Sequence, residues 1–297
     1  MGDFRLRVFL SVAKHLSFTK AAKELFISQP AISKHIQELE SEYKTTLFER
    51  KGNSITLTVA GKLMVKHAEE LRVQYRQLEY EMHQLNGDFV GELKIGASTT
   101  IAQYVLPPIL AKYLENYPRI KLSLFSGNSR EIEEALESHR IDIGLIEGNS
   151  RKSNLKYTPF LQDELIVIAR PNKRCNIEQI TLDELSKVPL ILREQGSGTL
   201  DVIEHAFISA GVKLKKLDVP LYLGSTESIK LFVQNSDSMG IVSVRAIQNE
   251  LALNKLQQIT IDGINMHREF CFVSLHGEVP QLVHKFILFA SRYKDKL

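Results

Sequence analysis

Four polar side chains near the N-terminus have the types and spacing needed to bind nucleobases: Gln29, Ser33, Lys34 and Gln37. On a helix they would share one side of the stretch SQPAISKHIQ. Glutamine and serine both donate and accept hydrogen bonds, which matches the mixed donors and acceptors of base edges in a major groove. A helix side that meets only water usually carries more glutamate and lysine. The pattern therefore predicts a helix that reads double-stranded DNA.

The helix that presents these groups has sequence signals for its start and for a buried side. The hydroxyl of Ser28 can cap the first turn, and Pro30 falls where a missing N–H costs little. The apolar side follows helical spacing and consists of Ala31, Ile32, Ile36 and Leu39. A shorter helix, capped by Thr19, is expected to precede it, with a tight turn over residues 26–28 between the two helices. Together they predict a helix-turn-helix.

Further basic groups follow the predicted reading helix. Residues 50–57 have the composition of a two-stranded ribbon with a Gly-Asn turn, and Arg50 and Lys51 are candidates for phosphate contact. Residues 1–62 contain ten Lys/Arg and six Asp/Glu, whereas the rest of the chain contains 28 and 29. The positive excess coincides with the reading helix, as attraction to DNA requires, although a chance asymmetry would give the same count.

A long helix is predicted from Thr58 to Asn86, where an Asn-Gly pair ends it. Its apolar residues alternate steps of four and three, which is coiled-coil spacing, and are Met64, Ala68, Leu71, Tyr75, Leu78, Met82 and Leu85. A lone helix of this length, about 40 Å, cannot bury so narrow a seam against itself. We therefore expect a second copy of the chain to cover the seam, with packing on the helix's own domain as the alternative.

From Glu92 onward, short apolar strands alternate with helices, a pattern typical of an α/β fold with a mainly parallel sheet. The helix expected over residues 102–116 contains Pro107-Pro108 and should be kinked or start late. The expected strands cover residues 93–97, 120–125, 141–146, 165–169, 190–192, 221–223, 240–243 and 270–274.

Small hydroxyl residues lie at three strand-to-helix junctions of this half. The clusters are Ser98-Thr99-Thr100, Gln195 to Thr199, and Ser225-Thr226. Open α/β sheets bind ligands at the carboxyl ends of strands, beside helix N-termini whose free N–H groups favour anions. Each cluster alone is more simply an ordinary N-cap. The three together predict a cleft for a small anion such as a carboxylate, sulfate or phosphate ester.

Other functions find little support in the sequence. No Ser/His/Asp or Cys/His set, GxSxG, GxGxxG or Walker pattern is present, and the nine histidines are scattered. Cys175 and Cys271 form no CxxC motif, so no disulfide framework, metal site or cofactor is expected. Charges interrupt the N-terminal apolar stretch and no apolar run approaches roughly 18 residues, so we expect a cytoplasmic protein without a membrane span. A small-molecule-binding protein or an enzyme on a periplasmic-binding fold is the alternative.

The run SFTKAAKELFISQPAISKHIQELESEYKTTLFER resembles the N-terminal helix-turn-helix of the LysR-type transcriptional regulators, and later segments match that family in order and spacing. The resemblance covers essentially the whole chain and implies an α+β fold class overall. Its parts would be a winged helix-turn-helix (1–58), a linker and dimerisation helix (59–87) and a type II periplasmic-binding-protein-like α/β effector domain (88–297). Two subdomains are implied, one of about 91–168 with 268–297 and one of about 169–267.

The resemblance also implies partners and sites: double-stranded DNA, a small anionic effector in the cleft, and self-association as a dimer or tetramer. The implied DNA-binding residues are Thr19, Ser28, Gln29, Pro30, Ser33, Lys34, Gln37, Arg50 and Lys51. The implied effector-binding residues are Ser98, Thr99, Thr100, Gln103, Ser197, Thr199 and Thr226. Many relatives with a GSGT loop place arginine next, where this chain has Leu200, so an anion would lose that cation here. The effector, the target genes, and the choices between activation and repression and between dimer and tetramer stay open.

Overall fold

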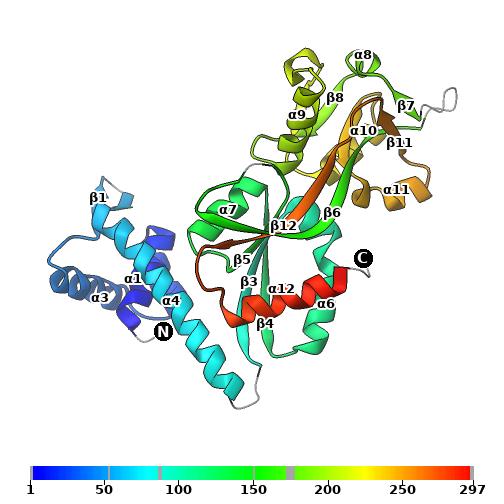
Figure 1. The fold of residues 1–297 in the computed structure, drawn as a ribbon. Helices are drawn as coiled ribbons and strands as arrows, with labels where there is room; N and C mark the ends of the chain where they lie inside the picture. Colours follow the sequence, from blue (N-terminus) through cyan, green and yellow to red (C-terminus); the bar gives the residue numbers. More distant parts are fainter. Residues whose placement is uncertain (1–2, 53, 86–88, 150, 172–177, 295–297) are drawn as a thin grey trace. The chain divides into compact units, whose positions relative to one another are not determined.

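The chain folds into two units, Met1–Gly91 and Glu92–Leu297, each with its own core (Figure 1). The computed structural model describes residues 3–52, 54–85, 89–149, 151–171 and 178–294. The predicted helix-turn-helix, wing and long helix make up the first unit. The predicted α/β half makes up the second.

Three short helices, a β-ribbon and one long helix form the first unit. In chain order they are α1 (Phe4–His15), α2 (Phe18–Leu25), α3 (Gln29–Glu42), β1 (Phe48–Lys51), β2 (Ser54–Leu57) and α4 (Val59–Leu85). Apolar residues at helical spacing face inward, and Phe9, Ile32 and Leu39 are fully buried between the helices. β1 and β2 pair antiparallel. These elements confirm the predicted winged helix-turn-helix and long helix, while the Asn-Gly pair predicted to end that helix lies outside the described residues.

The cap of α2 is Ser17 and not Thr19, so that part of the prediction was wrong. Ser17 has extended backbone (φ −156°, ψ 118°), and its hydroxyl accepts the Lys20 N–H at 3.3 Å. Thr19 already lies inside the helix, and its side chain is exposed. Ser28 does cap α3 as predicted, because its Oγ accepts the Ala31 N–H at 3.3 Å.

The second unit is an α/β structure that alternates strands and helices. Its first elements are β3 (Gly91–Ser98), α5 (Thr99–Tyr104), α6 (Leu106–Asn116), β4 (Ile120–Gly127), α7 (Ser129–Glu137), β5 (Ile143–Ile146) and β6 (Leu155–Ala169). The next are β7 (Gln179–Ile180), α8 (Leu182–Leu185), β8 (Leu190–Arg193), α9 (Gly198–Ser209), β9 (Leu221–Leu223), α10 (Thr226–Gln234) and β10 (Met239–Ser243). The last are α11 (Gln248–Ala252), β11 (Gln257–Ile261), β12 (His267–Leu275) and α12 (Gln281–Tyr293).

Two long strands, β6 and β12, join the two halves of this unit (Figure 1). The strand order is β4-β3-β5-β12-β6-β10-β8-β9, with β11 on β6 and β7 on β11. β6 pairs with β12 up to Glu164 and with β10 from Leu165 onward. We call the half with β3, β4 and β5 the first subdomain, and the half with β8, β9 and β10 the second subdomain.

The prediction of a mainly parallel sheet was only partly right. β3 and β5 pair parallel, as do β8, β9 and β10. β6 and β12 instead run antiparallel to each other and to their neighbours β10 and β5. The physical reason is connectivity: the chain leaves the first subdomain along β6 and returns along β12, so the two crossings have opposite directions.

Some elements also begin elsewhere than predicted. The helix expected over residues 102–116 is two helices, because the prolines open α6 while α5 starts at Thr99. β6 begins at Leu155, well before the predicted start at residue 165. The sequence pattern missed its first part because that part is polar and contains Pro159, which lies beside a register shift in the pairing with β12. β7, β11 and α11 were not predicted.

Within the described residues, no helix is both long and apolar enough to cross a membrane. Cys271 is buried with a free thiol, and Cys175 lies outside the described residues. The described part of the chain also contains no group of three or more His, Cys, Asp or Glu side chains placed to hold a metal ion.

Candidate nucleic-acid interface and ligand cleft

The polar side of α3 is open to solvent. Gln29, Lys34 and Gln37 are exposed, and Ser33 is half-buried. None of these four side chains makes a hydrogen bond or ion pair with another described residue. Ile32 on the opposite side is fully buried. The helix therefore presents unused donors and acceptors on a surface that its own core holds in place.

The other residues predicted to contact DNA have fewer side-chain donors and acceptors available for it. Thr19, Ser28 and Pro30 are exposed, but the Ser28 hydroxyl is already used as a helix cap. The wing turns at Gly52, whose φ of +61° lies in the left-handed region that glycine adopts without strain. The side chains of Arg50 and Lys51 lie outside the described part of the structure, so their phosphate contacts stay predictions.

Phe26, in the turn between α2 and α3, is a surface feature that the sequence pattern did not single out. Its side chain is 94% exposed. Its φ of +56° is in the left-handed region, which costs a non-glycine residue roughly 1–2 kcal/mol. Neither the core nor the backbone explains a phenylalanine here. Two residues before the cap of the reading helix, its ring could make the apolar contact with a thymine methyl that major-groove readers use.

A charged cluster joins α2 to α1, the two helices against which α3 packs. Glu24 accepts from Lys14 Nζ at 2.6 Å, lies 3.1 Å from His15 Nε2, and also accepts from the Ser11 hydroxyl. The hydrogen bonds from Lys14 and Ser11 lower the pKa of Glu24 to about 2, against the opposing effect of burial. The helix-turn-helix is therefore held by polar contacts as well as by its core.

The predicted coiled-coil seam is exposed along the later turns of α4. Leu71, Tyr75, Leu78, Met82 and Leu85 are exposed by 44, 39, 52, 55 and 81%. Such a row of large apolar side chains is unusual on a monomeric surface and typical of an interaction site. The first seam residue, Met64, instead packs against the core of the first unit.

The effector residues predicted at the first and third hydroxyl clusters face the junction of the two subdomains but already have partners. Thr99 Oγ1 accepts from Arg193 Nη1 at 2.8 Å. Thr100 Oγ1 lies 3.5 Å from Thr226 Oγ1. Both threonines of that pair and Arg193 are buried. The structure thus brings these two clusters together, as predicted.

Two more of the predicted effector residues, Ser98 and Thr199, use their hydroxyls to hold a carboxylate of the protein itself. Ser98 Oγ donates to Oε2 of Glu147, and Thr199 Oγ1 donates to Oε1 at 3.4 Å. Arg268 Nη1 donates to Thr199 Oγ1 at 2.9 Å and lies 3.6 Å from Glu147 Oε1, while its Nε donates to Asp163 at 2.7 Å. Nη2 of Arg268 is buried without a hydrogen-bond partner among the described residues. The cradle predicted for an external anion is therefore occupied by Glu147, and effector binding there stays a prediction.

The two subdomains touch closely beside this cradle. A Cβ added to Gly198 would lie 1.9 Å from the carbonyl oxygen of Glu147, so only glycine allows this approach. The Asn149 N–H donates to Asp201 at 2.6 Å, which joins the segment after β5 to α9. The cleft is closed along this line.

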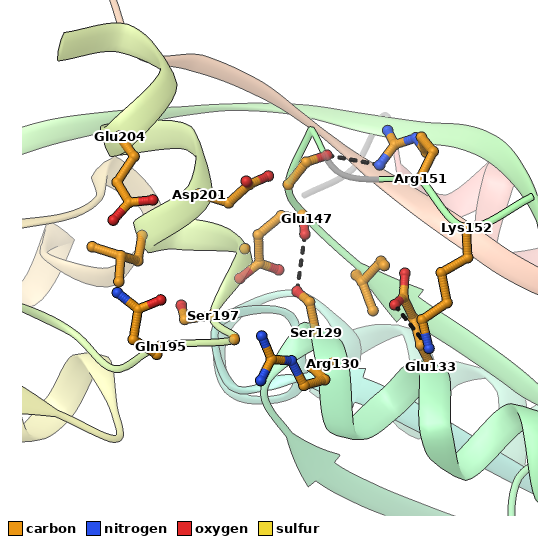
Figure 2. Close-up of a pocket in the computed structure, with 15 residues that line it drawn as sticks. Ser129, Arg130, Glu133, Glu147, Arg151, Lys152, Gln195, Ser197, Asp201 and Glu204 are labelled. Carbon is orange, nitrogen blue, oxygen red and sulfur yellow. Dashed lines mark hydrogen bonds and ion pairs between the residues drawn. The ribbon is translucent and has the colours of Figure 1, made fainter. Parts of the chain in front are cut away.

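A cavity of about 310 Å³ remains next to the closed line (Figure 2). Figure 2 shows both basic and acidic side chains on the wall from α7 and the segment after β5, and acidic side chains on the wall from α9. The labelled lining residues are Ser129, Arg130, Glu133, Glu147, Arg151, Lys152, Gln195, Ser197, Asp201 and Glu204. Of the predicted effector residues, Ser197 alone is among the described residues that line it.

A second polar latch crosses the subdomains at α5 and α10. Tyr104 donates to Glu227, and buried Lys230 lies 2.7 Å from Glu227 and 2.9 Å from Glu250. Burial, followed by the hydrogen bond to Glu227, raises the pKa of Tyr104 well above its ordinary value. The latch holds the same closed arrangement from another side.

Sequence reasoning missed the charged members of the cleft. Glu147 stands directly after the buried strand β5, so the rule applied to the hydroxyls, which looks at the carboxyl ends of parallel strands, could have found it. Arg193 and Arg268 carry no local signal, because their partners are distant in sequence. Gln103 is exposed and makes no hydrogen bond to another described residue, so its predicted role stays a prediction.

Two family models match the chain: "Bacterial regulatory helix-turn-helix protein, lysR family" over residues 4–62 and "LysR substrate binding domain" over residues 86–294. The HTH-type transcriptional regulator CysL of Bacillus subtilis is 32% identical over 270 residues, which cover 90% of this chain and 89% of that protein. The uncharacterized HTH-type transcriptional regulator YeiE of Escherichia coli K12 is 33% identical over 257 residues, 86% of this chain and 85% of that protein. Among solved structures, CbnR, a LysR family transcriptional regulator, is similar in fold with a TM-score of 0.69 at 22% identity, over 98% of this chain and 99% of that one.

Proposed function

The chain belongs to the LysR family of bacterial helix-turn-helix transcriptional regulators, and from that premise we propose how this member reads DNA and senses a ligand. Residues 1–58 would bind double-stranded DNA, residues 59–87 would pair two copies, and residues 88–297 would bind a small effector. The observation that carries the proposal is the exposed polar side of α3, whose side chains have no partner among the described residues.

On DNA, α3 would enter the major groove with its N-terminal residues against base edges. Gln29 offers an amide that can bind an adenine edge with two hydrogen bonds, and Lys34 offers a charge for a phosphate or a guanine. Phe26 would add an apolar contact from the preceding turn. Two copies joined through α4 would place two such helices about 34–36 Å apart, so the site should be a pseudo-palindrome.

In the second unit, an effector would act at the junction of the two subdomains. Ser98, Thr100, Thr199 and Thr226 converge there from both subdomains, which supports this assignment. A ligand that prefers one degree of closure would shift the population of subdomain arrangements and through it the spacing of the reading helices.

Fluorescence anisotropy with duplex DNA from upstream of the protein's own gene tests the DNA-binding part. We expect affinity to fall steeply as salt rises from about 50 to about 200 mM, because lysine and arginine release counterions from phosphates. Gln29→Ala should lose roughly 1–3 kcal/mol of discrimination at one base pair, and Lys34→Ala should reduce the salt slope by about one without changing sequence preference.

Gln248→Ala, which removes an exposed glutamine from the second unit, is the matched control and should behave as the wild type. Binding that ignores salt, or an unchanged sequence preference in Gln29→Ala, would count against this reading surface.

A further inference from the structure

The Glu147 carboxylate in the cleft has the surroundings of a bound oxyanion. Each of its oxygens is held: Oε2 by the Ser98 hydroxyl, and Oε1 by the Thr199 hydroxyl with Arg268 at 3.6 Å. Glu147 is only 2% exposed and Arg268 only 4%. A free carboxylate, sulfate or phosphate ester presents the same two oxygens to the same donors.

The donors around this carboxylate exceed what it uses. Arg268 has five N–H groups, and the structure employs Nε on Asp163 and Nη1 on Thr199. Its Nη2 is buried without a hydrogen-bond partner in the described chain. A buried unpaired donor on a charged group is costly, so Arg268 has hydrogen-bonding capacity that Glu147 and the other described residues leave unused. A tetrahedral anion with three or four oxygens could satisfy more of the donors than a carboxylate can.

We propose that Glu147 is a built-in competitor that fills the effector cradle in the ligand-free protein, and that the effector is a small oxyanion that displaces it. This inference rests on the proposed function for the identity of the cleft. Arg268 supplies a cation to this cradle, because its Nη1 donates to Thr199 Oγ1, which in turn donates to Glu147.

The displaced side chain has somewhere to go. The main chain of Glu147 is held by Ser129 Oγ, which donates to its carbonyl oxygen at 2.9 Å, so a rotamer change can move the carboxylate without moving the strand end. The neighbouring cavity is lined by Glu147 itself and by Arg130 (Figure 2). Arg130 is exposed, and its side chain has no ion-pair partner among the described residues. Its guanidinium would receive the released carboxylate.

Competition of this kind lowers apparent affinity for the external anion. If the cradle is free in about one molecule in ten, the apparent Kd is raised about tenfold over that of an empty cradle. Removing the charge of residue 147 should therefore tighten anion binding, whereas an ordinary structural ion pair would only lose stability.

Thermal unfolding of the full-length protein in sodium sulfate tests the proposal, with sodium chloride at equal ionic strength as the reference. Glu147→Gln and the shorter-reaching Glu147→Asp should both reach half of their sulfate-dependent rise in Tm at about tenfold lower sulfate than the wild type. Glu164→Gln, a half-buried glutamate on β6, is the matched control and should follow the wild type, since general sulfate stabilisation acts on all variants alike. Adding Thr199→Ala to Glu147→Gln should remove the gain.

An unchanged half-saturating sulfate concentration in both Glu147 variants, or a gain that survives loss of the Thr199 hydroxyl, would overturn the proposal. So would failure of both Glu147 variants to fold at any sulfate concentration, because Glu147 would then be a structural requirement. The DNA-binding assay on the same variants separates this result from the proposed function: sulfate binding without DNA binding contradicts the regulator, and DNA binding without the sulfate gain contradicts the competitor.

Discussion

The reading helix and the effector cleft use similar polar side chains in opposite ways. The polar side of α3 comes from one stretch of fourteen residues, is exposed, and has no internal partners within the described chain. The cleft assembles Ser98, Glu147, Thr199 and Arg268 from distant parts of the chain, buries them, and pairs most of their polar atoms with one another. The comparison indicates that the DNA-binding surface is ready before its partner arrives, whereas the cleft must exchange internal contacts for external ones. Regulation is expected on the side that exchanges.

The largest expected effect is on self-association through α4, which would bring two DNA-reading helices together in one dimer. Leu78→Gln places a polar side chain in the middle of the exposed seam of α4. If a second copy covers the seam, each dimer loses two buried leucines, which should weaken self-association by roughly 3–6 kcal/mol. Sedimentation velocity should show monomers at concentrations where the wild type is associated, and affinity for a two-half-site duplex should fall with it.

Leu63→Gln is the control for that change. Leu63 is a leucine of the same helix with a similar exposed fraction, 58% against 52% for Leu78, but it lies off the seam. It should leave the association state unchanged. Equal effects of the two substitutions would mean that the seam is not the dimer contact and that the reading surfaces are paired in another way.

The next largest effect is expected from disturbing the close contact between the two subdomains at Gly198. Gly198→Ala puts a methyl group 1.9 Å from the carbonyl oxygen of Glu147, which is backbone and cannot turn away. Overpacking of this kind typically costs 1–3 kcal/mol, so we expect about that loss in the free energy of unfolding of the second unit. Chemical denaturation followed by tyrosine fluorescence or circular dichroism measures it.

Gly224→Ala is the matched control, since an added Cβ there meets nothing within 4 Å and its backbone is not in the left-handed region. It should be close to neutral. Neutrality of Gly198→Ala as well would show that the two subdomains are not held this closely in solution. Neither change should alter the salt slope of DNA binding, because both glycines belong to the second unit.

The same contrast explains how much of the molecule the sequence could predict. The helix-turn-helix follows from local rules: a cap at Ser28, helical apolar spacing, and a polar side that fits nothing else. Thr19 was wrongly taken as a cap because the pattern could not tell which of two nearby hydroxyl residues has extended backbone; the structure gives that role to Ser17.

The α/β half was predicted in its short buried strands and missed where the signal is not local. The first part of β6 is polar and contains Pro159, so only its pairing with β12 defines it as a strand. The clustering of hydroxyls at strand ends follows from a general rule of open sheets and was found. That Arg268 would meet Thr199 depends on the return of β12 to the first subdomain, and a chain read in order does not show that return.

A smaller effect is expected at Phe26, the exposed aromatic residue beside the reading helix. Phe26→Asn keeps the turn but replaces an exposed ring with a residue that tolerates left-handed backbone. We expect the first unit to gain about 0.5–1 kcal/mol of stability, because the strain is relieved without loss of core packing. Affinity for the specific duplex should fall at the same time, and most at a thymine. A thermal melt and an anisotropy titration on the same sample measure both.

Tyr43→Asn is the control for this change, because Tyr43 is another exposed aromatic residue of the first unit and its backbone lies outside the left-handed region. Phe18 is unsuitable as a control position because it packs against the core. It should bring no gain in stability. A stable Phe26→Asn variant that binds DNA as tightly as the wild type would remove Phe26 from the reading surface.

The smallest expected effect is a pH dependence that belongs to the first unit. Hydrogen bonds from Lys14 and Ser11 hold the folded pKa of Glu24 at about 2, below the ordinary 4.5. A lowered folded pKa means that the contribution of Glu24 to stability is complete above pH 4.5 and is lost as the pH falls toward 2. Because the side chain is 36% exposed, solvent screens the interaction and the effect should be modest.

Glu24→Gln should therefore lower the Tm of the helix-turn-helix at neutral pH, and the gap to the wild type should close as the pH falls from 4.5 toward 2. Glu38→Gln, on an exposed glutamate of α3 with only a 3.4 Å contact to His35, provides the control for a lost surface charge. A gap between Glu24→Gln and the wild type that stays constant through acid would mean that the cluster does not hold α2 to α1 electrostatically. The reading surface would then depend on its apolar core alone, and the contrast with the polar, self-paired cleft would be sharper still.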